Sequence, residues 1–158
     1  MSFESGYWSL KAGPVIGVGG MYATENGLGN IVSIAAQVPS TAERQVWKIS
    51  VVEPKEENIF TIVLHNDGGT PGEESWSLRD KFPVPHGPIS TSEEISQWRI
   101  TRADNGLPSS HPIISIQPIT PATGGAWFVG TEGDRLVIIP FPIDVEQPPV
   151  WQATPHHN

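Results

Sequence analysis

Three short runs that each contain a tryptophan decide how this chain folds: "QVWKIS" (45–50), "SQWRIT" (96–101) and "PPVWQAT" (148–154). Their tryptophans, Trp47, Trp98 and Trp151, are 51 and 53 residues apart. Self-similarity at a fixed period is the signature of repeat architectures, in which neighbouring units complete one core. The spacing therefore predicts three repeats of about 52 residues each.

Other strand-like runs recur with the same period. "YWSL", "IFTI" and "IISI" alternate apolar and other residues, which is the strand pattern, and they align Trp8, Phe60 and Ile114. A second set, "GMYAT", "ESWSL" and "GAWFV", aligns Tyr22, Trp76 and Trp127. The predicted core therefore contains the following aromatic residues: Trp8, Tyr22, Trp47, Phe60, Trp76, Trp98, Trp127 and Trp151.

The third strand of each repeat is less regular. It is predicted at "NIVSIAAQ" (30–37) and "RLVIIPF" (135–141), and in the middle unit at "KFPVPHG" (81–87). Pro83 and Pro85 restrict that last run to an edge or broken strand, because proline cannot donate to a ladder. "TSEEISQW" (91–98) begins with a plausible helix cap and is expected to form a single helical turn.

Three units of four short strands predict an all-β fold, the β-trefoil, in which a closed six-stranded barrel is capped by three hairpins. A β-sandwich is the alternative. The 16 glycines and 16 prolines favour short strands and many turns over long helices. One domain, 1–158, is expected, with repeats at approximately 1–52, 53–105 and 106–158.

Composition limits the function. The net charge is −8 and no basic cluster is present, which argues against nucleic-acid and anionic-membrane partners. There is no cysteine, so disulfides and thiol catalysis are excluded. "MSFESGYWSL" does not resemble a secretory signal, and no apolar run has membrane-spanning length, so a cytoplasmic protein is expected. We also expect a monomer.

The sequence contains none of the common catalytic motifs, such as Gly-x-Ser-x-Gly, His-Glu-x-x-His or a phosphate-binding Walker loop. "HND" (65–67), "EPKEEN" (53–58) and "GEESW" (72–76) are interpreted as solvated polar loops. We therefore expect neither an enzyme nor a metal site or cofactor. "QVW" fits the Gln-x-Trp signature of ricin-type lectins, but the other repeats read "SQW" and "PVW", so a carbohydrate-binding trefoil is an alternative only.

Several segments resemble the fungal mycocypins, the clitocypin and macrocypin family of β-trefoil cysteine-protease inhibitors. These segments are "GYWSL", "GVGGMYAT" (17–24), "ERQVWKIS" and "FPIDVEQPPVWQAT". The resemblance implies reversible occlusion of the cleft of papain-like proteases by two loops. The implied protease-binding residues are Pro14, Val15, Ile16, Gly17, Val18, Gly19, Gly20, Val38, Pro39, Ser40, Thr41 and Ala42.

The family also suggests a further target, legumain, which cleaves after asparagine. The resemblance places the corresponding loop at "HNDGGTPGEE" (65–74) and its asparagine at Asn66, with Asn26 as a rival. A serine-protease inhibitor on the same scaffold is an alternative function. Neither "TENGLGN" (24–30) nor the 65–74 loop carries the Lys or Arg that trypsin requires, but Leu28 would suit a chymotrypsin-like pocket.

Overall fold

A computed structural model describes residues 5–12, 21–36, 38, 42–52, 58–65, 74–78, 85–102, 112–119, 126–141 and 149–155. The first repeat contains β1 (Gly6–Ala12), β2 (Met21–Thr24), β3 (Ser33–Ala36), a short 3-10 helix η1 (Ala42–Gln45) and β4 (Trp47–Val51). The second contains β5 (Ile59–Leu64), β6 (Ser75–Leu78), β7 (Ile89–Ser92) and β8 (Gln97–Arg102). The third contains β9 (Ile113–Pro118), β10 (Ala126–Glu132), β11 (Arg135–Phe141) and β12 (Trp151–Pro155).

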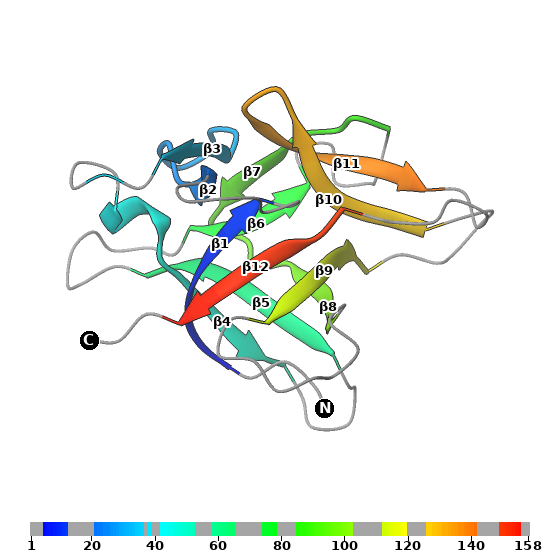
Figure 1. The fold of residues 1–158 in the computed structure, drawn as a ribbon, viewed down its shortest axis with the longest axis horizontal. Helices are drawn as coiled ribbons and strands as arrows, with labels where there is room; N and C mark the ends of the chain where they lie inside the picture. Colours follow the sequence, from blue (N-terminus) through cyan, green and yellow to red (C-terminus); the bar gives the residue numbers. More distant parts are fainter. Residues whose placement is uncertain are drawn as a thin grey trace.

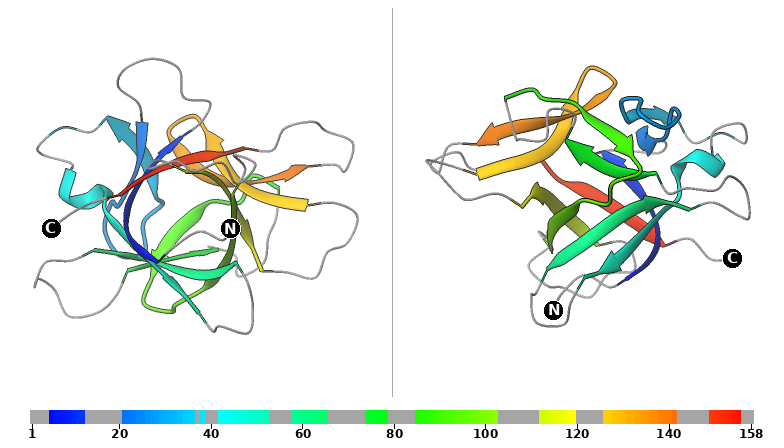
Figure 2. Two further views of the ribbon diagram at one scale, coloured as in Figure 1. Left: turned by 60° about the horizontal axis from the view of Figure 1, so that its bottom comes forward. Right: turned by 180° about the vertical axis from the view of Figure 1, so that it is seen from behind.

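The first and last strands of the repeats form a closed barrel. Antiparallel pairing runs from β1 through β4, β5, β8, β9 and β12, and β12 pairs with β1 again. The hairpins β2–β3, β6–β7 and β10–β11 lie together at one end of this ring (Figures 1 and 2). Closure removes the outer edges that an open sheet would expose. This arrangement is the β-trefoil predicted from the repeats.

The strand register confirms the alignment of the first and fourth strands. In each repeat the aromatic or isoleucine residue of the first strand faces the tryptophan of the fourth. The three pairs are Trp8–Trp47, Phe60–Trp98 and Ile114–Trp151. All three tryptophans of the fourth strands are almost completely buried. The 51- and 53-residue spacing therefore reflects three equivalent places in one core.

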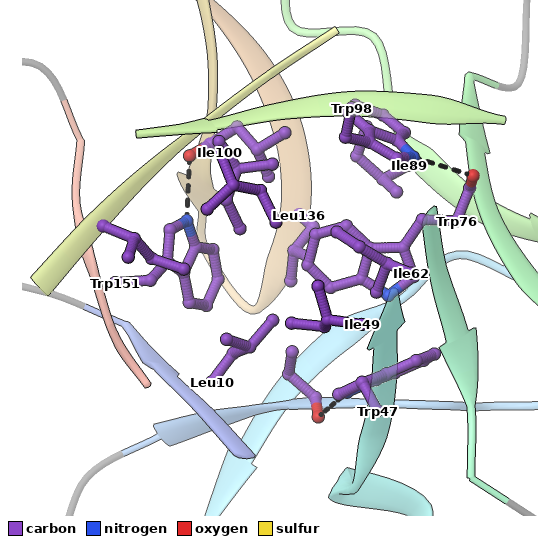
Figure 3. Close-up of a cluster of buried hydrophobic side chains, with 14 of the residues drawn as sticks. Leu10, Trp47, Ile49, Ile62, Trp76, Ile89, Trp98, Ile100, Leu136 and Trp151 are labelled. Atoms are coloured by element: carbon purple, nitrogen blue, oxygen red, sulfur yellow. Dashed lines mark hydrogen bonds between the residues drawn. The ribbon is translucent and has the colours of Figure 1, made fainter. Parts of the chain in front are cut away.

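The second strands are aligned differently from the prediction. Each fourth-strand indole donates a hydrogen bond from Nε1 to a second-strand carbonyl (Figure 3). The bonds join Trp47 to Ala23 (3.1 Å), Trp98 to Trp76 (3.1 Å) and Trp151 to Val129 (3.0 Å). The equivalent residues are thus Ala23, Trp76 and Val129. The predicted alignment of Tyr22 and Trp127 with Trp76 is wrong, and Trp8, Tyr22 and Trp127 are only half-buried.

Trp76 explains why aromatic matching failed. Its ring meets those of Trp47, Trp98 and Trp151 at tilted or edge-on angles, with centroids 5.5, 6.2 and 6.4 Å apart (Figure 3). One indole at the centre of the three repeats leaves room only for small residues at the two equivalent positions, because interiors are close-packed. Alanine and valine fill those positions.

Two local predictions in the second repeat are also wrong. Its third strand is Ile89–Ser92, whereas Pro85 and His86 form a turn in which His86 has a φ of 61°. No helical turn forms over 91–98, since these residues join β7 to β8 through a bend. The Ser92 hydroxyl accepts a hydrogen bond from the Glu94 amide (3.1 Å), as a helix cap would, but Gln97 and Trp98 pair with β5 and so belong to the sheet. Within the described ranges, no helix could cross a membrane.

Candidate functional site

The two segments predicted to contact a protease join the described structure at adjacent places in the first repeat. Met21, which directly follows residues 13–20, pairs with Ala36, which directly precedes residue 37. Lys11 of β1 pairs with Tyr22 in the same small sheet. Both segments are therefore tethered to one corner of the molecule, where β2, β3 and η1 lie together (left of Figure 1).

Apolar side chains are exposed where these segments begin and end. Met21 is 41% exposed and Val38 is 44% exposed. A single exposed apolar residue on a protein surface is ordinary. Here, however, one follows the first segment and the other lies at the start of the second, so both are available to a partner that covers this corner. Pro14–Gly20 and Pro39–Thr41 lie outside the described residues, and Ala42 opens η1.

Gln45 holds this corner together from the inside. Its buried Nε2 donates to the Thr24 hydroxyl (2.9 Å) and to the carbonyls of Ala35 (3.1 Å) and Ala36 (3.2 Å). These bonds connect η1 to the ends of β2 and β3. The Gln-x-Trp motif of this repeat is thus structural, because Gln45 and Trp47 both point into the protein.

Arg44 strengthens the same connection. Its carbonyl accepts from the Glu25 amide (2.9 Å), and its Nη1 donates to the Glu25 carbonyl (3.1 Å). Bonds in both directions fix η1 against the residue that follows β2. A loop on such a support loses less conformational entropy when it binds a partner.

Asn26 and Leu28 occupy a tight turn that is fully described. Asn26 Nδ2 donates to the Ile31 carbonyl and the Ser33 hydroxyl, each at 2.8 Å, so its amide braces the turn. Leu28 is 51% exposed at the apex, between Gly27 and Gly29, whose φ angles are 108° and 85°. These left-handed angles curve the backbone sharply. A peptide that binds by strand addition is extended, so the turn that carries Leu28 does not have that shape.

The second repeat anchors this turn. Thr91 donates its hydroxyl to the Gly27 carbonyl (2.8 Å), and both its hydroxyl (3.1 Å) and its carbonyl (3.0 Å) accept from the Gly29 amide. Leu28 is therefore presented by a rigid turn with contacts across two repeats.

A pair of carboxyl groups lies where the predicted legumain loop rejoins the structure. Glu74 follows residues 66–73. Its backbone carbonyl accepts a hydrogen bond from the backbone amide of Leu64, at the end of β5 (2.9 Å). Burial, a side-chain hydrogen bond with Glu25 and the charge of Glu25 raise the pKa of Glu74 to about 7. One carboxylate oxygen of Glu74 is buried, so this side chain is only partly solvated, in contrast to the interpretation from the sequence. Asn66 lies outside the described residues.

Metal chemistry gains no support from the described part of the chain, where no cluster of three or more His, Asp or Glu side chains could hold an ion. The corner formed by β2, β3 and η1 instead exposes the apolar side chains of Met21 and Val38. The class of protein that the fold defines is a β-trefoil.

Comparison with known proteins identifies the family. Residues 6–153 match the family described as peptidase inhibitor clitocypin, and the chain belongs to that family. It is 28% identical to Clitocypin-5 of Clitocybe nebularis over 97% of each chain. The protein is therefore a peptidase inhibitor, not an enzyme, and its partners are proteases.

A solved structure supports the fold independently. The designed threefold symmetric protein ThreeFoil superposes with a TM-score of 0.60, covering 94% of this chain and 97% of its own. The two sequences are only 12% identical, so this similarity concerns the arrangement of the strands and not the function.

Proposed function

We propose that this protein inhibits papain-like cysteine proteases reversibly, by placing residues 14–20 and 38–42 in the active-site cleft. The observation that carries the proposal is the Met21–Ala36 pair, which tethers both segments at one corner. Membership of the clitocypin family supports a protease as the partner. The inhibitor supplies no catalytic group, so inhibition follows from occlusion.

The first segment has the composition that close approach to a catalytic centre requires. It contains Gly17, Gly19 and Gly20, and glycine lets a backbone approach another surface without a side-chain clash. Gln45 and Arg44 hold the second segment's end in place before binding. An anchored end reduces the conformational entropy that a segment loses when it binds a partner.

The proposal is tested by titrating papain, legumain, trypsin and chymotrypsin with the purified protein. We expect papain to be inhibited, and Gly19→Glu to weaken that inhibition by at least about tenfold with unchanged thermal unfolding. No inhibition of papain at micromolar protein would refute the proposal. If Gly19→Glu lowers stability and inhibition together, the glycine serves the fold instead.

We also propose that the loop between β5 and β6 inhibits legumain through Asn66. Its support is the side-chain type that legumain recognises, in a part of the sequence outside the two segments proposed to bind papain. Asn66→Ala is expected to abolish legumain inhibition and to leave papain inhibition unchanged. Asn26→Ala is the comparison, since the Asn26 amide is engaged in its own turn.

Inhibition of a serine protease through Leu28 is the second candidate function. The exposure of Leu28 and the anchoring of its turn by Thr91 favour a protein contact. The curved backbone favours it less than an extended loop would. Inhibition of chymotrypsin that disappears in Leu28→Ala would establish this function. The single-domain division, the monomeric state and the cytoplasmic location stay predictions.

A further inference from the structure

A cavity of about 580 Å³ opens on the second repeat, between the β6–β7 hairpin, the start of β8 and the end of β9. Its polar lining includes Ser77, Ser90, Glu94, Ser96 and Gln97. This volume lies within the range of about 300–1,000 Å³ that is usual for small-molecule sites. The cavity lies in a different repeat from the segments proposed to bind papain.

The equivalent place in the first repeat is filled. The indole bonds set the equivalence, since each fourth-strand tryptophan is preceded two positions earlier by Gln45, Ser96 or Pro149. In the first repeat Gln45 extends to the Thr24 hydroxyl, with Nε2 and Oγ1 2.9 Å apart. Thr24 directly follows the carbonyl that accepts the indole bond of Trp47.

In the third repeat, different residues fill the equivalent space. Gly130 corresponds to Thr24, and a Cβ atom placed there would lie only 3.0 Å from Pro149 Cγ and 2.6 Å from Ile139 Cδ1. The proline ring and the isoleucine therefore occupy the space. In the second repeat the corresponding residues are Ser77 and Ser96, whose short side chains leave it open. Short side chains at these two positions therefore leave this part of the cavity open, whereas the first repeat has a longer side chain there and the third a packed proline ring.

Two hydroxyl groups that line the open space form no hydrogen bond within the described residues. Ser77 and Ser90 face each other across the β6–β7 ladder, and Ser90 is only 5% exposed. Neither hydroxyl forms a hydrogen bond with any residue that the structure describes. By contrast, Thr91 and Ser92 beside them use theirs within the protein. A buried hydroxyl with unused capacity is suited to a polar ligand, because polar groups are costly to leave unpaired.

We propose that this cavity binds a neutral saccharide unit. The serine hydroxyls and the Gln97 amide can both donate and accept, as sugar hydroxyls do, and the Glu94 carboxylate can accept from two of them. Leu78, Pro118 and Ile119 form an apolar wall of the same cavity, which suits the C–H face of a sugar ring. This second binding function does not depend on the proposed inhibition of papain.

The proposal is tested by following backbone amide NMR signals during titration with glucose, galactose, mannose and N-acetylglucosamine, and with their β-linked disaccharides. At least one of these sugars should give saturable shifts confined to β6, β7, β8 and the end of β9. Ser96→Gln should place a longer amide side chain in the cavity, within reach of the Ser77 hydroxyl as Gln45 reaches that of Thr24, and should weaken binding at least about tenfold. Thr101→Ala, an exposed hydroxyl change on β8 outside the cavity, is the matched control and should bind normally.

Other results would overturn the proposal. These are the absence of saturable shifts with every sugar, shifts located elsewhere, or unchanged binding by Ser96→Gln. Butylammonium serves as a cationic probe. If it bound and none of the sugars did, the cavity would be a cation site at Glu94 and the proposal would be wrong. If Ser96→Gln does not fold, Ser77→Ala decides, and unchanged sugar affinity in that variant contradicts the proposal. Papain inhibition by all these variants should equal that of the wild type, which separates this test from that of the inhibitory corner.

Discussion

The first and second repeats share a strand framework but differ at the start of their fourth strands. In the first repeat Gln45 crosses the gap and ties η1 to β2 and β3. In the second repeat Ser96 stops short and a cavity opens. The residue at this position therefore decides whether the space holds a side chain that links η1 to β2 and β3, or stays open. Trefoil symmetry therefore fixes the barrel, whereas single positions determine what each repeat can do.

Among the substitutions that test how the repeats differ, Trp76→Ala should have the largest effect on stability. Trp76→Ala is expected to lower the free energy of unfolding by about 3–5 kcal/mol, because the indole at the meeting point of the three repeats is fully buried. Denaturation in urea measures the loss. Trp8→Ala, a half-buried indole, is the control and should cost clearly less. Equal losses would show that Trp76 does not hold the repeats together.

Alanine substitution of Gln45 and of Ser96, each two residues before a fourth-strand tryptophan, should have different effects on stability. Gln45→Ala leaves the Thr24 hydroxyl and two backbone carbonyls without this donor, so we expect a loss of about 2–3 kcal/mol and weaker papain inhibition. Ser96→Ala should change stability by about 0.5 kcal/mol or less, because its hydroxyl faces the cavity. Chemical denaturation of both variants provides the measurement, and a larger effect at Ser96 would reverse our interpretation.

The carboxyl pair between the two repeats gives a smaller, pH-dependent effect. The pKa of Glu74 is about 7 in the folded protein, above its ordinary value of 4.5, so the folded state holds this proton more tightly. Its contribution to stability is complete below pH 4.5 and is lost as the pH rises through about 7. The melting temperature should therefore fall between these pH values, and Glu74→Gln should reduce that fall. A slope identical to that of the wild type would contradict the assignment.

Much of the fold could be predicted because the fourth-strand tryptophans are buried in every repeat and pair with Trp8, Phe60 and Ile114 of the first strands. The second strands could not be aligned by aromatic residues, since the central space admits one indole only. The third strand of the second repeat was misplaced because the proline-rich run before it also fits an edge strand.

Less of the site could be predicted. Once the repeats are aligned, the sequence shows that they differ two residues before each fourth-strand tryptophan. The residues there are Gln45, Ser96 and Pro149. Nothing in the sequence connects Glu25 with Glu74, because only the folded chain brings two different repeats together at that point. The predicted papain-binding residues depend on family resemblance, and the structure adds where their ends are tethered.

The most direct test of the inhibitory corner compares two exposed valines. Val38 lies at the predicted second segment, whereas Val51, 51% exposed, ends β4. We expect Val38→Glu to weaken papain inhibition at least about tenfold, and Val51→Glu to change it by less than about twofold, with both variants folded. Equal inhibition constants for the two variants would contradict the assignment of the corner formed by β2, β3 and η1 as the protease-binding site.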